Sequence, residues 1–230
     1  MGLTRRSRGR AGEIVLRERA GEYEIISNGM FLMDTRNGRS ERRLVRWALQ
    51  AGVQTRCDRE PTAPRRLLLG GLGVGWSLAE ALATTEVAEV VVVEWEPAII
   101  AFNRAATGER TGGRVDDPRV RCILDDLVAW LRRPGEGEFD AICLDVDNGP
   151  DWTVAPGNAW LYGEAGLRAL QARLAPGGVL GVWAAARSPT FEVALAQHFT
   201  TVRRREVPVP RGVPDVVYLA WGTPPADHSA

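Results

Sequence analysis

The chain has 230 residues, 45% of them hydrophobic, and its 29 basic and 29 acidic side chains give a formal net charge of zero. This length and composition suffice for one large domain with small additions. The balanced charge argues against broad binding to nucleic acid or to an acidic membrane surface. No long apolar segment or signal-peptide core is present in the sequence, so we expect a soluble, cytoplasmic protein. The cysteines Cys57, Cys122 and Cys143 lack metal-ligand spacing, so we expect no metal.

The N-terminal part of the chain predicts a small β unit. Residues 1–12 hold four closely spaced arginines and predict a disordered basic tail, with an interaction arm as the alternative. Strand patterns over 13–18 and 22–34, the second containing a Ser-Asn-Gly turn, predict an antiparallel β-hairpin. A helix then opens at Ser40. We therefore expect a small hairpin-plus-helix unit over residues 13–60.

Strand and helix patterns alternate over residues 61–222, and a second disordered tail is expected at 223–230. The predicted strands are 67–69, 90–94, 120–124, 139–145 and 179–184, and the predicted helices are 77–82, 97–106, 126–132, 164–174 and 191–198. Two extended segments, 201–207 and 216–221, follow with no helix between them and predict an antiparallel hairpin. The sequence therefore predicts an α/β, doubly wound, Rossmann-like and mostly parallel sheet with helices on both faces.

A glycine-rich turn joins the first of these strands to its helix. Gly71, Gly73 and Gly75 form a Gly-x-Gly-x-Gly pattern, and the next strand ends at Glu94, 19 residues after the last glycine. Glycines let the backbone approach a ligand, and an acid at the second strand tip can accept both ribose hydroxyls. We therefore expect an adenosine-bearing ligand here; a purely structural tight turn is the alternative.

The chain resembles the spermidine/spermine synthase (polyamine aminopropyltransferase) family, which has a class I S-adenosylmethionine-dependent methyltransferase fold. The glycine stretch of that family matches residues 71–76, and its following Leu-Arg-Glu-Val-Leu matches 78–82. Its catalytic-loop pattern Asp-Ser-Ser-Asp-Pro matches 145–149. The resemblance spans residues 13–221 and is firmest over 66–184.

The resemblance implies a site for S-adenosylmethionine or decarboxylated S-adenosylmethionine, with no metal. It implies that Glu94 binds the ribose and that Asp126 binds the adenine amine, while Trp95 takes the position of a side chain over the adenine face. Together with the three glycines these are the expected cofactor-binding residues: Gly71, Gly73, Gly75, Glu94, Trp95 and Asp126. The expected partner is a small-molecule acceptor, and a homodimer is left open.

Asp145 is the expected catalytic residue. It ends an apolar strand at the edge of the sheet where ligands bind in these folds, and a carboxylate there could deprotonate an amine. Asp147, Asn148 and Trp152 in the following loop are the expected substrate-binding residues. For Asp147 and Asn148, local hydrogen bonding within a turn is an equal alternative.

Several positions depart from the pattern of the family. An aspartate of its glycine loop is Val74 here, its second loop aspartate is Asn148, and its Phe-Tyr pair falls on Gly166 and Leu167. A polyamine needs carboxylates to replace its lost hydration. We therefore expect an alkyl (aminopropyl-type) transferase that is not an efficient putrescine enzyme. A small-molecule methyltransferase and a non-catalytic cofactor-binding interaction protein are the alternatives.

Overall fold

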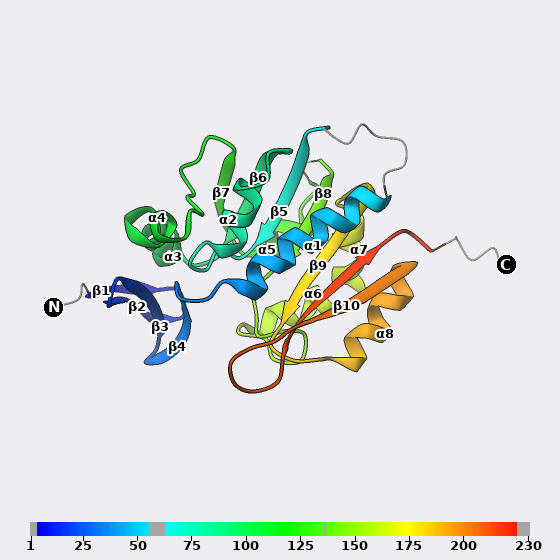
Figure 1. Ribbon diagram of the computed structural model, residues 1–230. Helices are drawn as coiled ribbons and strands as arrows, with labels where there is room; N and C mark the ends of the chain where they lie inside the picture. The colour runs from blue at the N-terminus through cyan, green and yellow to red at the C-terminus, as the bar shows by residue number, and fades with distance from the viewer. Residues whose placement is uncertain (1–3, 56–62, 136, 225–230) are drawn as a thin grey trace.

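The computed structural model describes residues 4–55, 63–135 and 137–224, which form two sheets linked by a long helix, α1 (Arg39–Thr55). The smaller sheet is antiparallel, and its strands follow one another in chain order. Its strands are β1 (Thr4–Gly9), β2 (Gly12–Arg19), β3 (Glu22–Ser27) and β4 (Met30–Asp34). It lies at the N-terminal end of the molecule, and α1 runs from it across the central sheet (Figure 1).

The central sheet has seven strands in the order β10-β11-β9-β8-β5-β6-β7. They are β5 (Arg65–Gly70), β6 (Val87–Glu94), β7 (Val120–Leu124), β8 (Phe139–Leu144), β9 (Leu174–Ala184), β10 (Thr201–Val207) and β11 (Asp215–Trp221). Strands β5 to β9 pair in parallel, whereas β11 runs antiparallel to both β9 and β10. The predicted α/β class and the C-terminal hairpin are both confirmed.

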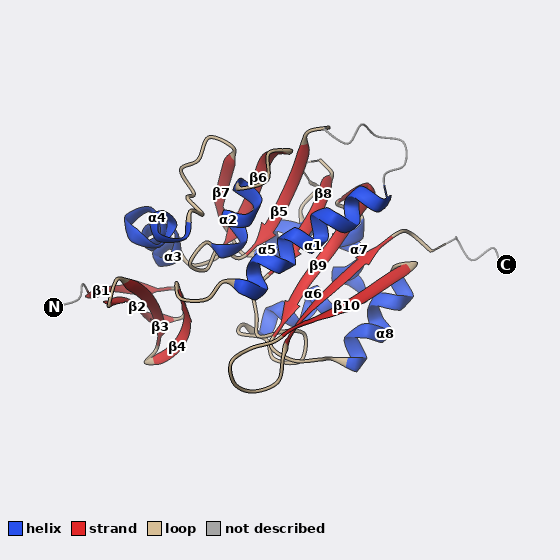
Figure 2. Cartoon of the chain, in the orientation of Figure 1, coloured by secondary structure: helices blue, strands red, loops and turns tan. Residues whose placement is uncertain are grey.

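Helices cover both faces of this sheet, and each face has its own apolar core (Figure 2). The helical segments after α1 are α2 (Trp76–Leu82), α3 (Pro97–Phe102), a π-helical turn (Asn103–Thr107), α4 (Gly108–Thr111), α5 (Leu127–Arg132), a 3₁₀ turn (Pro156–Asn158), α6 (Ala159–Tyr162), α7 (Glu164–Gln171) and α8 (Pro189–His198). Helices α1, α2 and α3 contribute to one core, and α5 to α8 contribute to the other.

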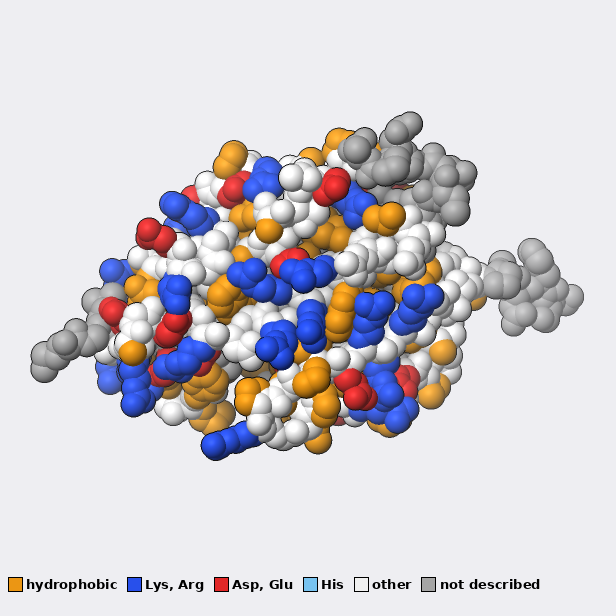
Figure 3. All heavy atoms as spheres, in the orientation of Figure 1, with side chains coloured by type: hydrophobic (Ala, Val, Ile, Leu, Met, Phe, Trp, Pro, Cys, Tyr) orange, Lys and Arg blue, Asp and Glu red, His pale blue; other side chains and the backbone are white. Residues whose placement is uncertain are grey.

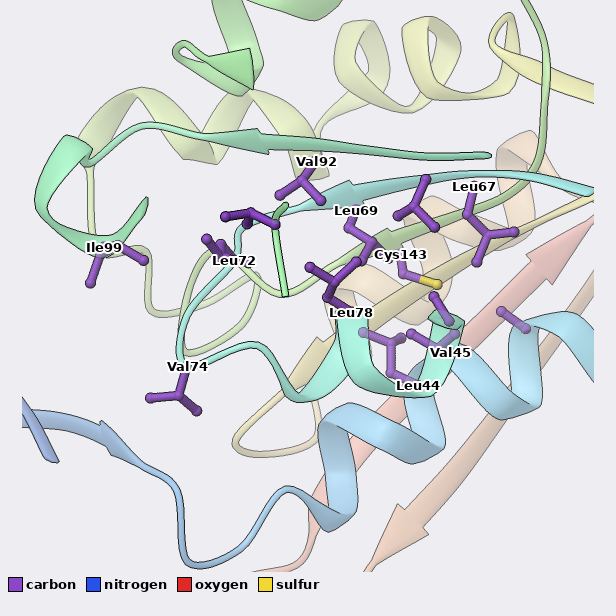
Figure 4. Close-up of a cluster of buried hydrophobic side chains, with 14 of the residues drawn as sticks. Leu44, Val45, Leu67, Leu69, Leu72, Val74, Leu78, Val92, Ile99 and Cys143 are labelled. Carbon is purple, nitrogen blue, oxygen red and sulfur yellow. The ribbon is translucent and has the colours of Figure 1, made fainter. Parts of the chain in front are cut away.

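Helix α1 is part of the core of the central sheet, although its sequence position suggested a separate N-terminal unit. It contacts β8, β9 and β11, and Leu44 and Val45 are fully buried. Figure 4 shows these two side chains beside Leu78 of α2 and Cys143 of β8. Burial of this apolar stripe fixes the position of α1, and therefore of the residues in its first turn.

Three predicted segments differ from the structure. The basic segment expected to be disordered forms β1, because a two-residue turn pairs it with β2 and Arg6 forms an ion pair with Glu13. The predicted helix 97–106 is interrupted by the π-helical turn after Phe102. The helix predicted to reach residue 174 ends at Gln171, because Leu174 already pairs with Phe139 in the sheet. Cys57 and residues 225–230 lie outside the described residues.

Candidate active site at the carboxyl edge of the sheet

The predicted site residues follow four neighbouring strands of the central sheet. The glycine turn follows β5, Glu94 ends β6, Asp126 follows β7 and Asp145 follows β8. These strands are adjacent in the order β8-β5-β6-β7 and are parallel. Their carboxyl ends therefore meet at one edge, which is where ligands bind in open α/β sheets.

The glycine turn needs glycine at each of the three positions. Gly71, Gly73 and Gly75 have φ angles of 87°, 53° and 99°, in the region that favours glycine. A Cβ atom on Gly71 would lie 2.5 Å from the carbonyl oxygen of Asp145, and one on Gly75 would lie 2.8 Å from that of Gly113. The turn is thus packed directly against the segment that follows β8.

Glu94 is buried at the tip of β6 and is held by the backbone. One carboxylate oxygen accepts the Leu72 N–H and the other accepts the Glu96 N–H, each at 2.8 Å. Burial raises the pKa of Glu94, and these hydrogen bonds oppose the rise. A carboxylate offers about four acceptor positions. Because the Trp95 N–H also interacts with this carboxylate, about one of these positions is left for a ligand.

Trp95 and Asp126 flank Glu94 and both have partners within the protein. Trp95 is 36% exposed, and the guanidinium carbon of Arg10 lies 5.9 Å from the centre of its ring. Arg10 also donates its backbone N–H to Glu96 at 2.8 Å, which ties the end of β1 to this edge. Asp126 caps α5 by accepting the Ala129 N–H at 2.8 Å. Its second carboxylate oxygen adds an acceptor beside the carboxyl end of β7.

Asp145 lies where the glycine turn, α1 and β11 meet. Its backbone N–H donates to the Gly70 carbonyl at 3.0 Å, and its side chain interacts with the Ser77 hydroxyl. Burial raises the pKa of Asp145 to about 8, and the nearby carboxyl groups of Glu41 and Asp215 contribute to that rise. A carboxyl group with this pKa can accept and release a proton near neutral pH, which is the requirement for a general base.

Sequence reasoning missed the two acids that face Asp145. Glu41 lies in the first turn of α1, and Asp215 is the first residue of β11. Burial raises the pKa of both carboxyl groups, and their mutual repulsion adds to the rise for Glu41. Three acids far apart in the chain are thus close enough to interact electrostatically. The sequence showed only that Glu41 lies at the start of a predicted helix, and it did not show that Glu41 lies near Asp145.

Serine hydroxyls connect this acid cluster, which consists of Glu41, Asp145 and Asp215. Ser40 donates to the Glu41 carboxylate at 3.1 Å and also interacts with Asp215. Ser77, in the first turn of α2, lies 3.4 Å from the Glu41 carbonyl oxygen and interacts with Asp145. The hydroxyls lower the pKa of the acids that they contact, but burial has the larger effect, so the three pKa values remain raised. Such a cluster is suited to a cationic group.

The loop after β8 is organised by Asp147. Its buried carboxylate accepts the Val154 N–H at 2.6 Å, the Asn158 side-chain amide at 2.9 Å and the Tyr162 hydroxyl at 2.8 Å. This arrangement favours the alternative of local hydrogen bonding over substrate binding for Asp147. The carbonyl oxygen of Asn148 accepts the Ala185 N–H at 2.9 Å. Trp152, in contrast, is 68% exposed at the surface of the loop.

Three positions that depart from the family pattern are buried. Val74 is buried, and its carbonyl oxygen accepts the Thr111 hydroxyl at 3.2 Å. A Cβ atom on Gly166 would lie 2.0 Å from the Trp160 carbonyl oxygen, so a larger residue does not fit between α6 and α7. Leu167 is fully buried in the core. Neither Gly166 nor Leu167 is a counterpart of the polar groups expected in a polyamine site.

Two negative findings apply to the described part of the chain. No group of three or more His, Cys, Asp and Glu residues there is arranged to hold a metal ion. None of its helices has both the length and the apolar character required to cross a membrane.

The chain is similar in sequence to known polyamine aminopropyltransferases. No family model matches the chain. The polyamine aminopropyltransferase of Mycobacterium tuberculosis (strain CDC 1551 / Oshkosh) is 33% identical over 177 residues, covering 75% of this chain and 31% of the relative. That of Synechococcus sp. (strain JA-2-3B'a(2-13)) is 30% identical over 141 residues, covering 61% of this chain and 43% of the relative. The chain thus spans about a third to less than half of the length of these relatives.

The fold is that of solved spermidine synthases. The crystal structure of spermidine synthase from Thermotoga maritima superposes with a TM-score of 0.71 and 18% identity, covering 97% of this chain and 74% of that chain. A spermidine synthase in complex with the transition state analogue AdoDATO gives a TM-score of 0.69 and 17% identity, covering 97% and 73% of the two chains. The resemblance predicted from the sequence is therefore confirmed in sequence and in fold.

We predict that Asp147→Asn destabilises the protein by about 1–3 kcal/mol, because an amide NH₂ group replaces one acceptor and leaves a buried donor without a partner. Chemical denaturation measures the change in the free energy of unfolding. Asp151→Asn is the matched control, since this exposed residue lies in the same loop. Equal stability of Asp147→Asn and the control would contradict the role assigned to Asp147.

Proposed function

We propose that this chain, which belongs to the spermidine synthase-like family, is a transferase that moves an aminopropyl-type alkyl group from a sulfonium donor to a small amine. The observation that carries the proposal is the acid cluster beside the glycine turn. A cationic amine leaving water requires anionic partners, and Glu41, Asp145 and Asp215 supply up to three carboxylates at the ligand edge of the sheet.

The residues present fit the adenosine part of an S-adenosylmethionine-type donor. Glu94 has an acceptor position left for a ribose hydroxyl, beside the backbone N–H groups of Leu72, Trp95 and Glu96. Asp126 has an acceptor for an adenine amine, and Trp95 offers a partly exposed ring beside it. When bound, the donor supplies an alkyl carbon that the adjacent positive sulfur makes electrophilic.

The protein has two tasks in such a transfer. It must hold the amine nitrogen in line with the electrophilic carbon, and it must remove a proton from that nitrogen. The Asp145 carboxylate, with a pKa of about 8, accepts the proton as the nitrogen–carbon bond forms. Glu41 and Asp215 balance the charge of the acceptor and orient it. Trp152, exposed on the loop after β8, is suited to cover an apolar part of the acceptor.

Methyl transfer from intact S-adenosylmethionine is the second candidate. The observation that favours it is Val74, a buried apolar residue where the family has an acid for the amine of the decarboxylated donor. The acid cluster supports an amine acceptor in either case, so the two candidates differ in the donor. A non-catalytic binding protein is less supported, because it would not require an acid with a raised pKa beside the glycine turn.

We predict that Glu94→Ala weakens binding of methylthioadenosine by about 2–3 kcal/mol, because it removes charge-assisted hydrogen bonding to the ribose. Titration calorimetry measures the affinity. Glu89→Ala is the matched control, because Glu89 lies on the same strand and pairs with Arg66 away from the site. Circular dichroism confirms the fold of both variants. Unchanged affinity in folded Glu94→Ala would rule out the ribose assignment.

We predict that Asp145→Asn lowers turnover by roughly 10²–10⁴-fold and leaves affinity for methylthioadenosine nearly unchanged, since the amide keeps the shape of the side chain but cannot accept the proton. With an amine identified by screening for methylthioadenosine release, kcat/KM of the wild type should rise with pH through about 8, where Asp145 ionises. The variant should lack that rise. Full activity of Asp145→Asn would reject Asp145 as the base and make Glu41 the next candidate.

We predict low activity with putrescine, well below a typical turnover of about 10 per second, because the family's loop acids are replaced at Val74 and Asn148. The measurement incubates the protein with putrescine and either decarboxylated or intact S-adenosylmethionine. Release of methylthioadenosine indicates aminopropyl transfer, whereas release of S-adenosylhomocysteine indicates methyl transfer. Rapid spermidine formation would show that Glu41 and Asp215 fully compensate for these substitutions.

A further inference from the structure

A groove lies between α1 and the edge strand β10, away from the acid cluster. It encloses about 280 Å³ and is lined by Trp47, Gln50, Ala51, Val53, Gln54, Arg203, Arg205 and Leu219. Buried Leu219 of β11 forms its floor, while α1 and β10 form its walls. Arginine side chains gather along α1 and β10 on this face of the molecule (Figure 3). The groove therefore combines an apolar floor with basic walls.

The basic side chains of the groove come from one face of β10. Arg203 and Arg205 alternate with Arg204, and they pair in register with Leu219 and Val217, which belong to the core beneath α1. Arg204 pairs with Tyr218 and forms an ion pair with Glu192 of α8, on the opposite face. Arg203 and Arg205 thus face the groove, and Arg204 does not.

Three guanidinium groups at or near the groove have no carboxylate partner among the described residues. Within the described residues, Arg43, Arg203 and Arg205 form no ion pair, and their contacts are with aromatic rings. The guanidinium carbons of Arg43 and Arg205 lie 5.6 and 4.9 Å from the centre of the Trp47 ring, and that of Arg203 lies 5.3 Å from the Trp221 ring. In contrast, Arg46 on the other side of α1 pairs with Glu80.

We propose that this groove binds a small phosphate-bearing anion. The guanidinium groups of Arg203 and Arg205, with Arg43 on the same Trp47 ring as Arg205, favour an anion of more than one negative charge, which a phosphate monoester or a pyrophosphate carries. The planar, forked donors of arginine match phosphate oxygens, and the carboxamides of Gln50 and Gln54 add neutral donors on the other wall. The apolar floor leaves space for a small organic part of the ligand.

The groove and the acid cluster lie on the same helix. Glu41 is in the first turn of α1, whereas the lining residues of α1 begin at Trp47 and end at Gln54. At 1.5 Å per residue, the two sites are separated by roughly 9–20 Å along the helix axis. The anion site is therefore distinct from the proposed catalytic site, and its test does not depend on the proposed function.

Titration calorimetry of the whole chain with pyrophosphate at low ionic strength tests the proposal. We expect the double variant Arg203→Gln/Arg205→Gln to bind at least tenfold more weakly than the wild type. Arg204→Gln is the matched control, because it removes the same charge from the same strand on the opposite face; we expect its affinity to stay within about threefold. Arg203→Lys/Arg205→Lys keeps the charge but loses the forked donors, and we expect intermediate affinity.

Four results would overturn the proposal. If the wild type binds pyrophosphate no better than Arg203→Gln/Arg205→Gln does, the groove holds no anion site. An equal loss in Arg204→Gln would indicate general charge attraction, and equal affinity for succinate would remove the preference for phosphate. If the wild type and the double variant differ in mass by sedimentation, the groove of the wild type is occupied by a second copy of the chain. Thermal unfolding and methylthioadenosine binding, both expected to be unchanged, control for the fold of the variants.

Discussion

The close approach of the glycine turn to the segment after β8 is the constraint on which the site depends. With a Cβ at Gly71, the backbone of Asp145 would be displaced, because the two would be only 2.5 Å apart. Glycine therefore has a packing role here that is separate from any ligand. The same contact sets the distance between the turn, where an adenosine-bearing ligand is proposed to bind, and the carboxyl group proposed as the base.

Helix α1 supplies the second half of this arrangement. Burial of Leu44 and Val45 against the central sheet fixes the position of the first turn of α1, and Glu41 lies in that turn. Asp215 arrives from the opposite end of the chain because β11 inserts between β9 and β10. The acid cluster thus depends on two features of the packing: α1 lies on one face of the sheet, and β11 inserts between two of its strands.

The sequence predicted the elements that have local signals, and it failed where tertiary contacts decide. The alternating strands and helices, the glycine turn and the C-terminal hairpin follow from periodicity and turn residues, and they are confirmed. Local patterns could not show that Glu41 and Asp215 meet Asp145, since 104 and 70 residues separate them from it in the chain. For Asp147 the sequence left both roles open, and the hydrogen bonds to the loop favour the structural one. The prediction of a disordered tail was wrong for the segment that forms β1. Its arginines suggested exposure to solvent, whereas the ion pair between Arg6 and Glu13 supports the pairing of this segment with β2.

The raised pKa of Asp145 links stability, ligand charge and pH. Its value is about 8 in the folded chain, against a reference value of 3.8. Between these values the folded state holds a proton that the unfolded state has lost, so this stabilising contribution is present below about pH 4 and is lost as the pH rises through 8. A cationic amine in the cluster would reverse the balance, because a positive charge favours the ionised carboxyl groups. Binding of the acceptor would then release protons and restore stability at the pH where the ligand-free chain loses it. A neutral acceptor would do neither, so the proton release that accompanies binding reports the charge of the acceptor independently of catalysis.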